Sequence, residues 1–329
     1  MEENQAKQLV ADTGRVLLQE GLVARTWGNI SCRTEGSKFA ISPSGLGYEN
    51  MTGEDVPVYD YTTETWEGAR KPSSEKKIHA AAYQLYPDVN FVIHTHQDYA
   101  TAVGLVGVKE LTMTEEEARL LGHIEVAGYG LPGTGKLKKN VALALTGGSR
   151  VVLMKHHGAV ILGKDEADAI AKAKALEAVC QRTVEEAIGV RTVNEHPEEQ
   201  LSPELRKACA DLVVISDNFL LKAANDGGIR AQLDDIAQML GKTLKSVPND
   251  DGAILKALDG QDAVLVRDVG CVILTEEAGD AEALKLLCAK AAMAKCLTDA
   301  KGVKTKLSAF DCKLMRFVYK KKYSRKKEG

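Results

Sequence analysis

The chain has 329 residues, enough for one large domain or two of ordinary size. Its formal net charge of −3 gives no overall positive field, so we expect neither a nucleic acid nor a membrane surface as partner. The sequence has no run of about 18 apolar residues, and its polar start, Met1–Asn4, is unlike a secretory signal. Seven scattered cysteines without a Cys-x-x-Cys pair indicate reduced thiols and predict a cytoplasmic protein.

Helical and extended patterns alternate through the first part of the chain. Apolar residues at helical spacing predict a helix over residues 4–20, which Gly21 ends. In chain order we then expect a glycine turn leading into a strand at 27–31, strands at 38–42 and 58–61, and a polar stretch at 62–71.

A helix start is predicted at Pro72-Ser73-Ser74-Glu75. Serine is a common N-cap residue, and the helix dipole stabilises a carboxylate in the first turn. In isolation the motif therefore has an ordinary structural interpretation. We expect the helix to continue to Pro87, and further helical and strand segments to alternate up to Leu145.

The run 91–96, Phe-Val-Ile-His-Thr-His, is apolar and β-branched and predicts a buried strand. Side chains two positions apart on a strand point to the same face, so His94 and His96 aim at one point. A lone histidine on a strand is usually a hydrogen-bonded core residue, but two buried imidazoles on one face need shared partners. We interpret this pair as metal ligands, and His79 and His123 as structural residues.

A third histidine is available in Lys155-His156-His157-Gly158, which continues the apolar strand predicted from residue 151. On a regular strand the two histidines would point to opposite faces, so one of them joins the site and the spacing does not choose between them. Three imidazoles and the carboxylate of Glu75 predict a catalytic zinc site with three protein ligands, one open position and a nearby acid–base group.

Hydroxyl groups and glycines predict an anion site beside this metal. A helix N-terminus that carries Ser73-Ser74 can bind phosphate through its N–H groups. The Gly28-Asn29 turn and the Ser44-Gly45 loop supply further donors, and glycine lets a ligand approach the backbone closely. The prediction depends on these loops converging in space.

The chain is expected to divide near residue 200. A long helix rich in Ala, Lys and Glu is predicted at 165–187, and the mostly polar residues 190–203 are interpreted as a linker. The basic tail, 320–329, has two interpretations: contact with an anionic partner, or a solvated, disordered terminus, which we favour.

Beyond the linker the chain partly repeats itself. The run 264–274 echoes 152–162 at a constant offset, and an Ala-rich helix follows each copy. A constant offset suggests duplication of a structural unit; the alternative is that strand–turn–helix units look alike by chance. The copy has Asp268-Val269 in place of His156-His157, so a duplicated half would have lost the metal.

As a set, these motifs resemble the class II aldolase/adducin family, and within it the L-fuculose-phosphate and related ketose-phosphate aldolases. The resemblance covers about residues 5–190, and its elements occur in the family order. They are Gly28-Asn29-x-Ser31, Ser42-Pro43-Ser44-Gly45, Pro72-Ser73-Ser74-Glu75, the Ala80-Ala81-Ala82-Tyr83 helix, His94-x-His96 and His156-His157-Gly158.

The resemblance implies a site and a fold. It implies a zinc ion, or another divalent metal, held by His94, His96 and His157, with Glu75 as the catalytic acid–base. The residues that it implies for the substrate phosphate are Gly28, Asn29, Ser44, Gly45, Ser73 and Ser74. The implied fold is an α/β/α sandwich around a mostly antiparallel central sheet, commonly assembled as a homo-oligomer with sites at subunit interfaces.

The activity implied is aldol cleavage of a small ketose-1-phosphate to dihydroxyacetone phosphate and an aldehyde. Epimerases of the family carry aspartate at the position of Glu75, which favours an aldolase. The aldolases use a tyrosine from a neighbouring subunit as proton donor, whereas the matching region here is Met113-Thr114-Glu115. The alternatives are a dehydratase, decarboxylase or epimerase of the same superfamily, and a non-catalytic adducin-like interaction module.

We therefore predict a class II aldolase-like catalytic domain at 1–195 and a smaller, related α/β domain at 200–329 without metal ligands. The second domain is interpreted as a degenerate half-copy that fills a neighbouring subunit's place in the assembly. The predicted partners are a small phosphorylated sugar and further copies of the chain.

Overall fold

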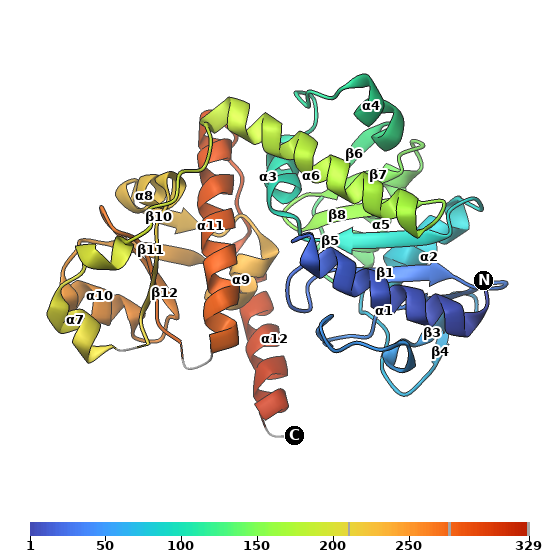
Figure 1. The fold of residues 1–329 in the computed structure, drawn as a ribbon, viewed down its shortest axis with the longest axis horizontal. Coiled ribbons are helices and arrows are strands. Elements are labelled where there is room, and N and C mark those ends of the chain that lie inside the picture. Colours follow the sequence, from blue (N-terminus) through green and yellow to red (C-terminus); the bar gives the residue numbers. More distant parts are fainter. Residues whose placement is uncertain (210, 276–277, 328–329) are drawn as a thin grey trace. The chain divides into compact units, whose positions relative to one another are not determined.

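The computed structural model describes residues 1–209, 211–275 and 278–327. The chain forms two compact units, Met1–Thr183 and Val184–Gly329, whose elements are labelled in Figure 1. Among the described residues, no helix combines the length and the apolar character needed to cross a membrane.

The first unit is built on an eight-stranded sheet with the order β4-β3-β2-β1-β5-β8-β7-β6. Neighbouring strands are antiparallel except β6 and β7, which run parallel. The strands are β1 (Asn29–Arg33), β2 (Lys38–Ile41), β3 (Val58–Asp60), β4 (Thr65–Glu67), β5 (Phe91–Thr95), β6 (Ile124–Ala127), β7 (Val151–Met154) and β8 (Gly158–Gly163). The helices are α1 (Glu3–Gln19), η1 (Gly53–Asp55), α2 (Lys76–Leu85), α3 (Asp98–Val106), α4 (Glu115–Leu121), α5 (Gly135–Leu145) and α6 (Glu166–Ile188).

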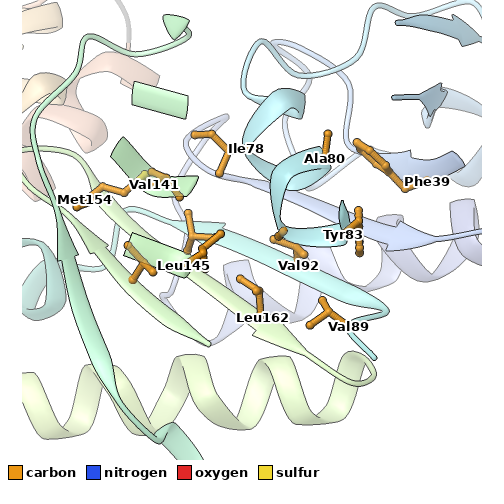
Figure 2. Close-up of a cluster of buried hydrophobic side chains, with 14 of the residues drawn as sticks. Phe39, Ile78, Ala80, Tyr83, Val89, Val92, Val141, Leu145, Met154 and Leu162 are labelled. Atoms are coloured by element: carbon orange, nitrogen blue, oxygen red, sulfur yellow. The ribbon is translucent and has the colours of Figure 1, made fainter. Parts of the chain in front are cut away.

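Helices cover both faces of this sheet. Figure 2 shows α2 and α5 packing their apolar side chains, such as Tyr83 and Leu145, against Val92 and Leu162 of the sheet. On the opposite face α1 contacts β1 and β2, α3 contacts β7 and β8, and α1 and α6 lie in front of the sheet in Figure 1. The predicted α/β/α sandwich with a mostly antiparallel sheet is confirmed.

Burial on both faces explains the sequence pattern of the central strands. Every residue of β5, β7 and β8 is buried, because helices cover both faces of the sheet at these strands. Such strands have continuous apolar runs in place of the alternation of a half-exposed strand. The histidines of 91–96 therefore stand out against an otherwise apolar background.

Two local predictions for the first unit were wrong, and one strand was not predicted. The strand from residue 151 does not carry His156 and His157: β7 ends at Met154, and 155–157 form a turn into β8. The polar stretch 62–71, for which we predicted no element, contains the exposed edge strand β4. Helix α2 begins at Lys76, with Glu75 at its N-cap position and no side-chain cap, so serine is not the cap and Glu75 is not in the first turn.

The second unit has a five-stranded sheet with the order β10-β11-β12-β13-β9, in which β11 and β12 are parallel and the other neighbours antiparallel. Its strands are β9 (Val213–Ile215), β10 (Gly228–Arg230), β11 (Thr243–Val247), β12 (Ala263–Val266) and β13 (Gly270–Ile273). Its helices are η2 (Pro197–Gln200), α7 (Pro203–Ala208), α8 (Asn218–Asn225), α9 (Asp234–Leu240), α10 (Asp251–Leu258), α11 (Ala278–Ala300) and α12 (Ala309–Lys327).

The chain is helical through most of the basic tail for which we favoured disorder. Helix α12 extends to Lys327, and residues 328–329 lie outside the described part of the chain. Cys312 and Met315 are buried on one side of this helix, which contacts α9. Packing of that side explains why the helix forms in spite of its basic end.

The hairpins β7–β8 and β12–β13 have the same register. Met154 pairs with Gly158 in the first, and Val266 pairs with Gly270 in the second. In each unit a parallel strand precedes the hairpin, an antiparallel strand flanks it on the other side, and a helix of 23 residues follows it. The echo between the two sequence runs therefore extends to strand order and register.

Candidate active site

Three imidazoles converge at one end of the first unit's sheet. His94 lies near the end of β5, His96 follows that strand, and His157 lies in the turn between β7 and β8. One ring nitrogen of each lies within 4.8 Å of the others. The Nε2 atoms of His94 and His96 are 3.1 Å apart, and the rings of His94 and His157 stack with centroids separated by 5.0 Å.

The hydrogen bonds of His94 fit a role as metal ligand. Its Nδ1 lies 2.8 Å from the carbonyl oxygen of Ala159, so Nδ1 carries the hydrogen and donates it. In the neutral ring, which is the form that binds a metal, Nε2 then has a lone pair, and this atom lies 3.1 Å from Nε2 of His96. A backbone carbonyl that orients a ring in this way is the usual support of a ligating histidine. Three imidazole nitrogens with one open position suit a divalent ion such as zinc.

The turn between β7 and β8 separates the two neighbouring histidines. His156 has a left-handed backbone, with φ +70°, and its ring packs edge-on against Tyr129 at 5.1 Å. His157 is buried, and its Nε2 lies 3.0 Å from Oε1 of Glu75. The structure therefore brings His157 to the cluster and turns His156 away from it.

Glu75 lies against the cluster from the start of α2. Its side chain is 8% exposed, and its Oε2 lies 3.2 Å from Nε2 of His94. Burial by itself would raise the pKa of Glu75, but the charges and hydrogen bonds of His157 and His94 hold that pKa well below its ordinary value. A cation held by the imidazoles would act in the same direction. The carboxylate is therefore ionised at neutral pH.

The predicted phosphate loops lie next to one another. The backbone N–H of Ser73 donates to the carbonyl of Ser42, and the N–H of Ser44 donates to that of Lys71. Ser42 in turn accepts a bond at its hydroxyl from the N–H of Ile30, just after the glycine turn. The three predicted segments therefore converge, as the anion-site prediction required.

The residues predicted for phosphate differ in their accessibility. Ser44, Gly45 and Ser74 are exposed, so a ligand can reach their polar groups. Ser73 is buried, and its hydroxyl accepts the N–H of Glu75. The backbone of Gly28 passes close to the carbonyl oxygen of His94.

Asn29 contacts the predicted acid–base directly. Its Nδ2 donates to Oε2 of Glu75 at 3.0 Å, and its Oδ1 lies against Nε2 of His79. One hydrogen of Nδ2 is left for a ligand. The sequence interpretation missed these contacts and treated His79 as structural. The four-residue spacing from Glu75 to His79, which aligns side chains along a helix, was the available signal.

The segment that matches the family tyrosine begins a helix. Thr114 is the N-cap of α4, and its hydroxyl accepts the N–H of Glu117 at 3.2 Å. The side chain of Glu117 accepts the N–H of Thr114 in return, which completes a capping box. Thr114 thus has a structural role in starting this helix.

The fold and the site define a class of protein: an α/β/α sandwich in which three imidazoles meet a buried carboxylate at the end of a helix. The family model of the Class II Aldolase and Adducin N-terminal domain matches residues 8–184, which include all of these groups. The chain belongs to the class II aldolase/adducin family, and the resemblance seen in its motifs is confirmed.

Relatives of two enzyme types are similar to this chain. L-ribulose-5-phosphate 4-epimerase UlaF of Salmonella paratyphi C is 35% identical over 190 residues, covering 53% of this chain and 82% of the relative. L-fuculose phosphate aldolase of Methanococcus maripaludis is 33% identical over 167 residues, covering 51% and 89%. The solved structure of an L-fuculose 1-phosphate aldolase has 30% identity and a TM-score of 0.50, covering 54% and 84%.

Proposed function

We propose that the protein is a metal-dependent aldolase that cleaves a small ketose-1-phosphate to dihydroxyacetone phosphate and an aldehyde. The observation that carries the proposal is the ionised, buried carboxylate of Glu75, 3.0 Å from Nε2 of His157 and 3.2 Å from Nε2 of His94. A general base must lie beside the group that it serves. The similarity to L-fuculose phosphate aldolase supports a phosphorylated sugar as substrate.

His94, His96 and His157 would hold the divalent ion, and we propose zinc. When bound, the ion would act as a Lewis acid that stabilises negative charge on substrate oxygens. The imidazoles bind a metal in their neutral form, so metal affinity should fall below about pH 6.5 as protons compete for the ring nitrogens.

Glu75 would move the proton that the cleavage requires. The carboxylate takes the proton of the substrate hydroxyl as the C–C bond breaks, and the hydroxyl oxygen becomes the aldehyde oxygen. The same proton then goes to the carbon that lost its bond, which completes dihydroxyacetone phosphate. With a helix start at Thr114 in place of a tyrosine, we assign both transfers to Glu75.

The substrate phosphate would bind at the converging loops. We propose hydrogen bonds from the exposed Ser44, Gly45 and Ser74, with Gly28, Asn29 and Ser73 completing the surface. Helix α2 begins beside them, and the positive end of its dipole would favour a phosphate there.

We propose that residues 1–195 form the catalytic domain and that residues 200–329 form a metal-free copy of its second half. The shared hairpin register supports this division. In that register the copy has Val214, Ser216 and Val269 at the positions of the three histidine ligands. One ion per chain is therefore expected. An oligomer in which the copy fills a neighbouring subunit's place stays a prediction, and its test is whether a chain cut after residue 195 assembles and turns over like the full chain.

We also propose that the protein is cytoplasmic. All seven cysteines are free thiols, and six of them are buried. Free thiols are typical of a reducing compartment, which supports the cytoplasm.

Release of dihydroxyacetone phosphate tests the function. The metal-loaded protein is given a panel of ketose-1-phosphates with and without chelator, and Glu75→Gln serves as the blank. We expect chelator-sensitive release, reduced about 100- to 10,000-fold in the variant because it lacks the acid–base group. The similarity to L-ribulose-5-phosphate 4-epimerase makes epimerisation the second candidate. Inversion of a sugar carbon without triose release would replace the aldolase proposal with that one.

A further inference from the structure

A row of hydrogen bonds leads from Glu75 into the core of the first unit. Oε2 of Glu75 accepts from Asn29, whose Oδ1 is 2.5 Å from Nε2 of His79. Nδ1 of His79 is 2.6 Å from the hydroxyl of Ser31, and that hydroxyl is 2.7 Å from the hydroxyl of Tyr83. All five side chains are buried, so the row runs where solvent does not compete for its bonds.

The row joins one face of a helix to one face of a strand. Glu75 at the N-cap of α2 is followed at intervals of four residues by His79 and Tyr83 within the helix, and Asn29 and Ser31 are two apart on β1. Both spacings place side chains on a common face. Around the inner end of the row the core is apolar: Phe39 packs against the rings of His79 and Tyr83, and Figure 2 shows Phe39 and Tyr83 within the buried cluster.

The donors and acceptors of the row can be assigned from its outer end. The NH₂ group of Asn29 donates to Oε2 of Glu75, so the oxygen of the same amide faces Nε2 of His79. The oxygen needs a donor, so the hydrogen of His79 is on Nε2. Burial lowers the pKa of His79 to about 3, so the ring is neutral and its Nδ1 accepts from Ser31. The hydroxyl of Ser31 then accepts from Tyr83.

The shape of the Asn29 amide does not by itself fix which way the amide is turned. An amide that is turned over has nearly the same shape, but its oxygen would face the carboxylate of Glu75 and its nitrogen would face His79. Two acceptors in contact in a buried place are costly, because neither has a hydrogen bond. The hydrogen on Nε2 of His79 disfavours that orientation. It bonds to the amide oxygen of Asn29 in the observed orientation, whereas it would face the NH₂ group if the amide were turned over.

We propose that His79 is a positioning residue for the reaction: it acts through the amide of Asn29 to hold the carboxylate of Glu75 against the imidazole cluster. The catalytic consequence rests on the acid–base role proposed for Glu75, whereas the hydrogen-bond assignment does not. His79 bonds to Asn29 and Ser31, so its link to the imidazole cluster runs through Asn29 and Glu75. Its contribution should appear in kcat and leave KM and metal affinity nearly unchanged.

A pair of conservative variants tests this role. The side-chain amide of glutamine can place its nitrogen near Nε2 of the imidazole, whereas that of asparagine reaches only about as far as Nδ1. We expect His79→Asn to lower kcat about 10- to 100-fold, the range for residues that orient a functional group, while His79→Gln recovers much of that loss. In an Asn29→Ala background, His79→Asn should have no further effect on kcat. Equal losses of kcat in His79→Asn and His79→Gln would overturn the proposal. So would losses that add fully when His79→Asn is combined with Asn29→Ala.

The ¹⁵N chemical shifts of the His79 ring test the assignment without a variant. We expect a neutral ring with its hydrogen on Nε2 from pH 8 down to pH 5. A hydrogen on Nδ1, or a charged ring, would overturn the proposal even if the variants were active. Failure of the aldolase assay with the expected ring state would instead count against the proposed function, so the two failures are distinguishable.

Discussion

The hairpins β7–β8 and β12–β13 share a backbone but differ in the side chains of their turns. Each turn has a non-glycine residue with a left-handed backbone at the same place, His156 at φ +70° and Asp268 at φ +61°. This conformation is unfavourable for most residues, though Asn, Asp and His tolerate it best. Two sequences that differ at this position thus make the same turn.

A glycine is required at the start of the second strand in both hairpins. A Cβ atom on Gly158 would lie 2.1 Å from the carbonyl oxygen of Thr95, and one on Gly270 would lie 2.4 Å from that of Ile215. The neighbouring strand approaches too closely for any side chain. The glycine of the His-His-Gly motif therefore serves the backbone, since the hairpin without the histidines has the glycine too.

The difference between the hairpins lies in the groups that could bind a metal. His157 meets Glu75 and two imidazoles, whereas Val269 is part of an apolar cluster with Val266 and Val272. The comparison teaches that the turn and the site are separable: the backbone geometry is present in both units, and the candidate metal chemistry needs three added imidazoles.

Exchanging these residues between the hairpins should have the largest effect. We expect His157→Val to weaken zinc binding more than about 100-fold, since loss of a direct ligand should exceed the effect of losing an outer-shell partner. Titration against a coloured chelator measures it. The reverse exchange, Val269→His, should leave the stoichiometry at one ion per chain, because Val214 and Ser216 stand at the other two positions. If His157→Val bound zinc with the affinity of the wild type, the histidine cluster would not be the zinc site.

Alanine at the two glycines should destabilise both units. We expect Gly158→Ala and Gly270→Ala each to lower the free energy of unfolding by about 2 kcal/mol, as overpacking forces the neighbouring strand to shift. Urea unfolding measures the loss. Gly135→Ala and Gly279→Ala are matched controls, because a Cβ atom at either helical position meets no atom within 4 Å. An effect at Gly158 without one at Gly270 would contradict a shared backbone requirement.

Acid should weaken the metal-free first unit through His79. Its folded pKa of about 3 is below the ordinary value of 6.5, so between these values the unfolded chain takes up a proton that the folded chain does not. Stability should therefore fall as the pH decreases, by about 2 kcal/mol at pH 5 from this group. The free energy of unfolding is measured at pH 7 and pH 5 in the wild type and in His79→Gln. The difference between the two proteins in their pH dependence gives the contribution of His79. The histidine of the second unit, His196, is exposed and lacks this burial.

The smallest effect is expected at the left-handed turn residues. His156→Ala and Asp268→Ala should each cost about 1 kcal/mol of stability, because alanine is disfavoured at positive φ. Glycine at the same positions should recover most of the loss, since it adopts this conformation readily. Thermal unfolding with a zinc titration checks both points. A loss of zinc affinity in His156→Gly would make His156 part of the metal site and contradict its orientation toward Tyr129.

Short-range patterns of the sequence determined much of the fold. The helix expected at 4–20 is Glu3–Gln19, and the one expected at 165–187 is Glu166–Ile188. The period-2 alternation of 91–96 brought His94 and His96 to one face, and the set of motifs indicated the family. These inferences held because helical spacing and strand alternation are properties of a few consecutive residues.

Tertiary structure decided the parts of the site that come from distant segments. The choice between His156 and His157 depended on a turn whose left-handed residue breaks the strand alternation, which no period in the sequence records. The bonds of Asn29 to Glu75 and His79 join segments more than forty residues apart. The sequence alone determined which chemical groups the chain carries and which lie on a common local face; packing of α2 against the sheet decided which of them meet, because side chains distant in sequence acquire a distance only when the elements that carry them come together.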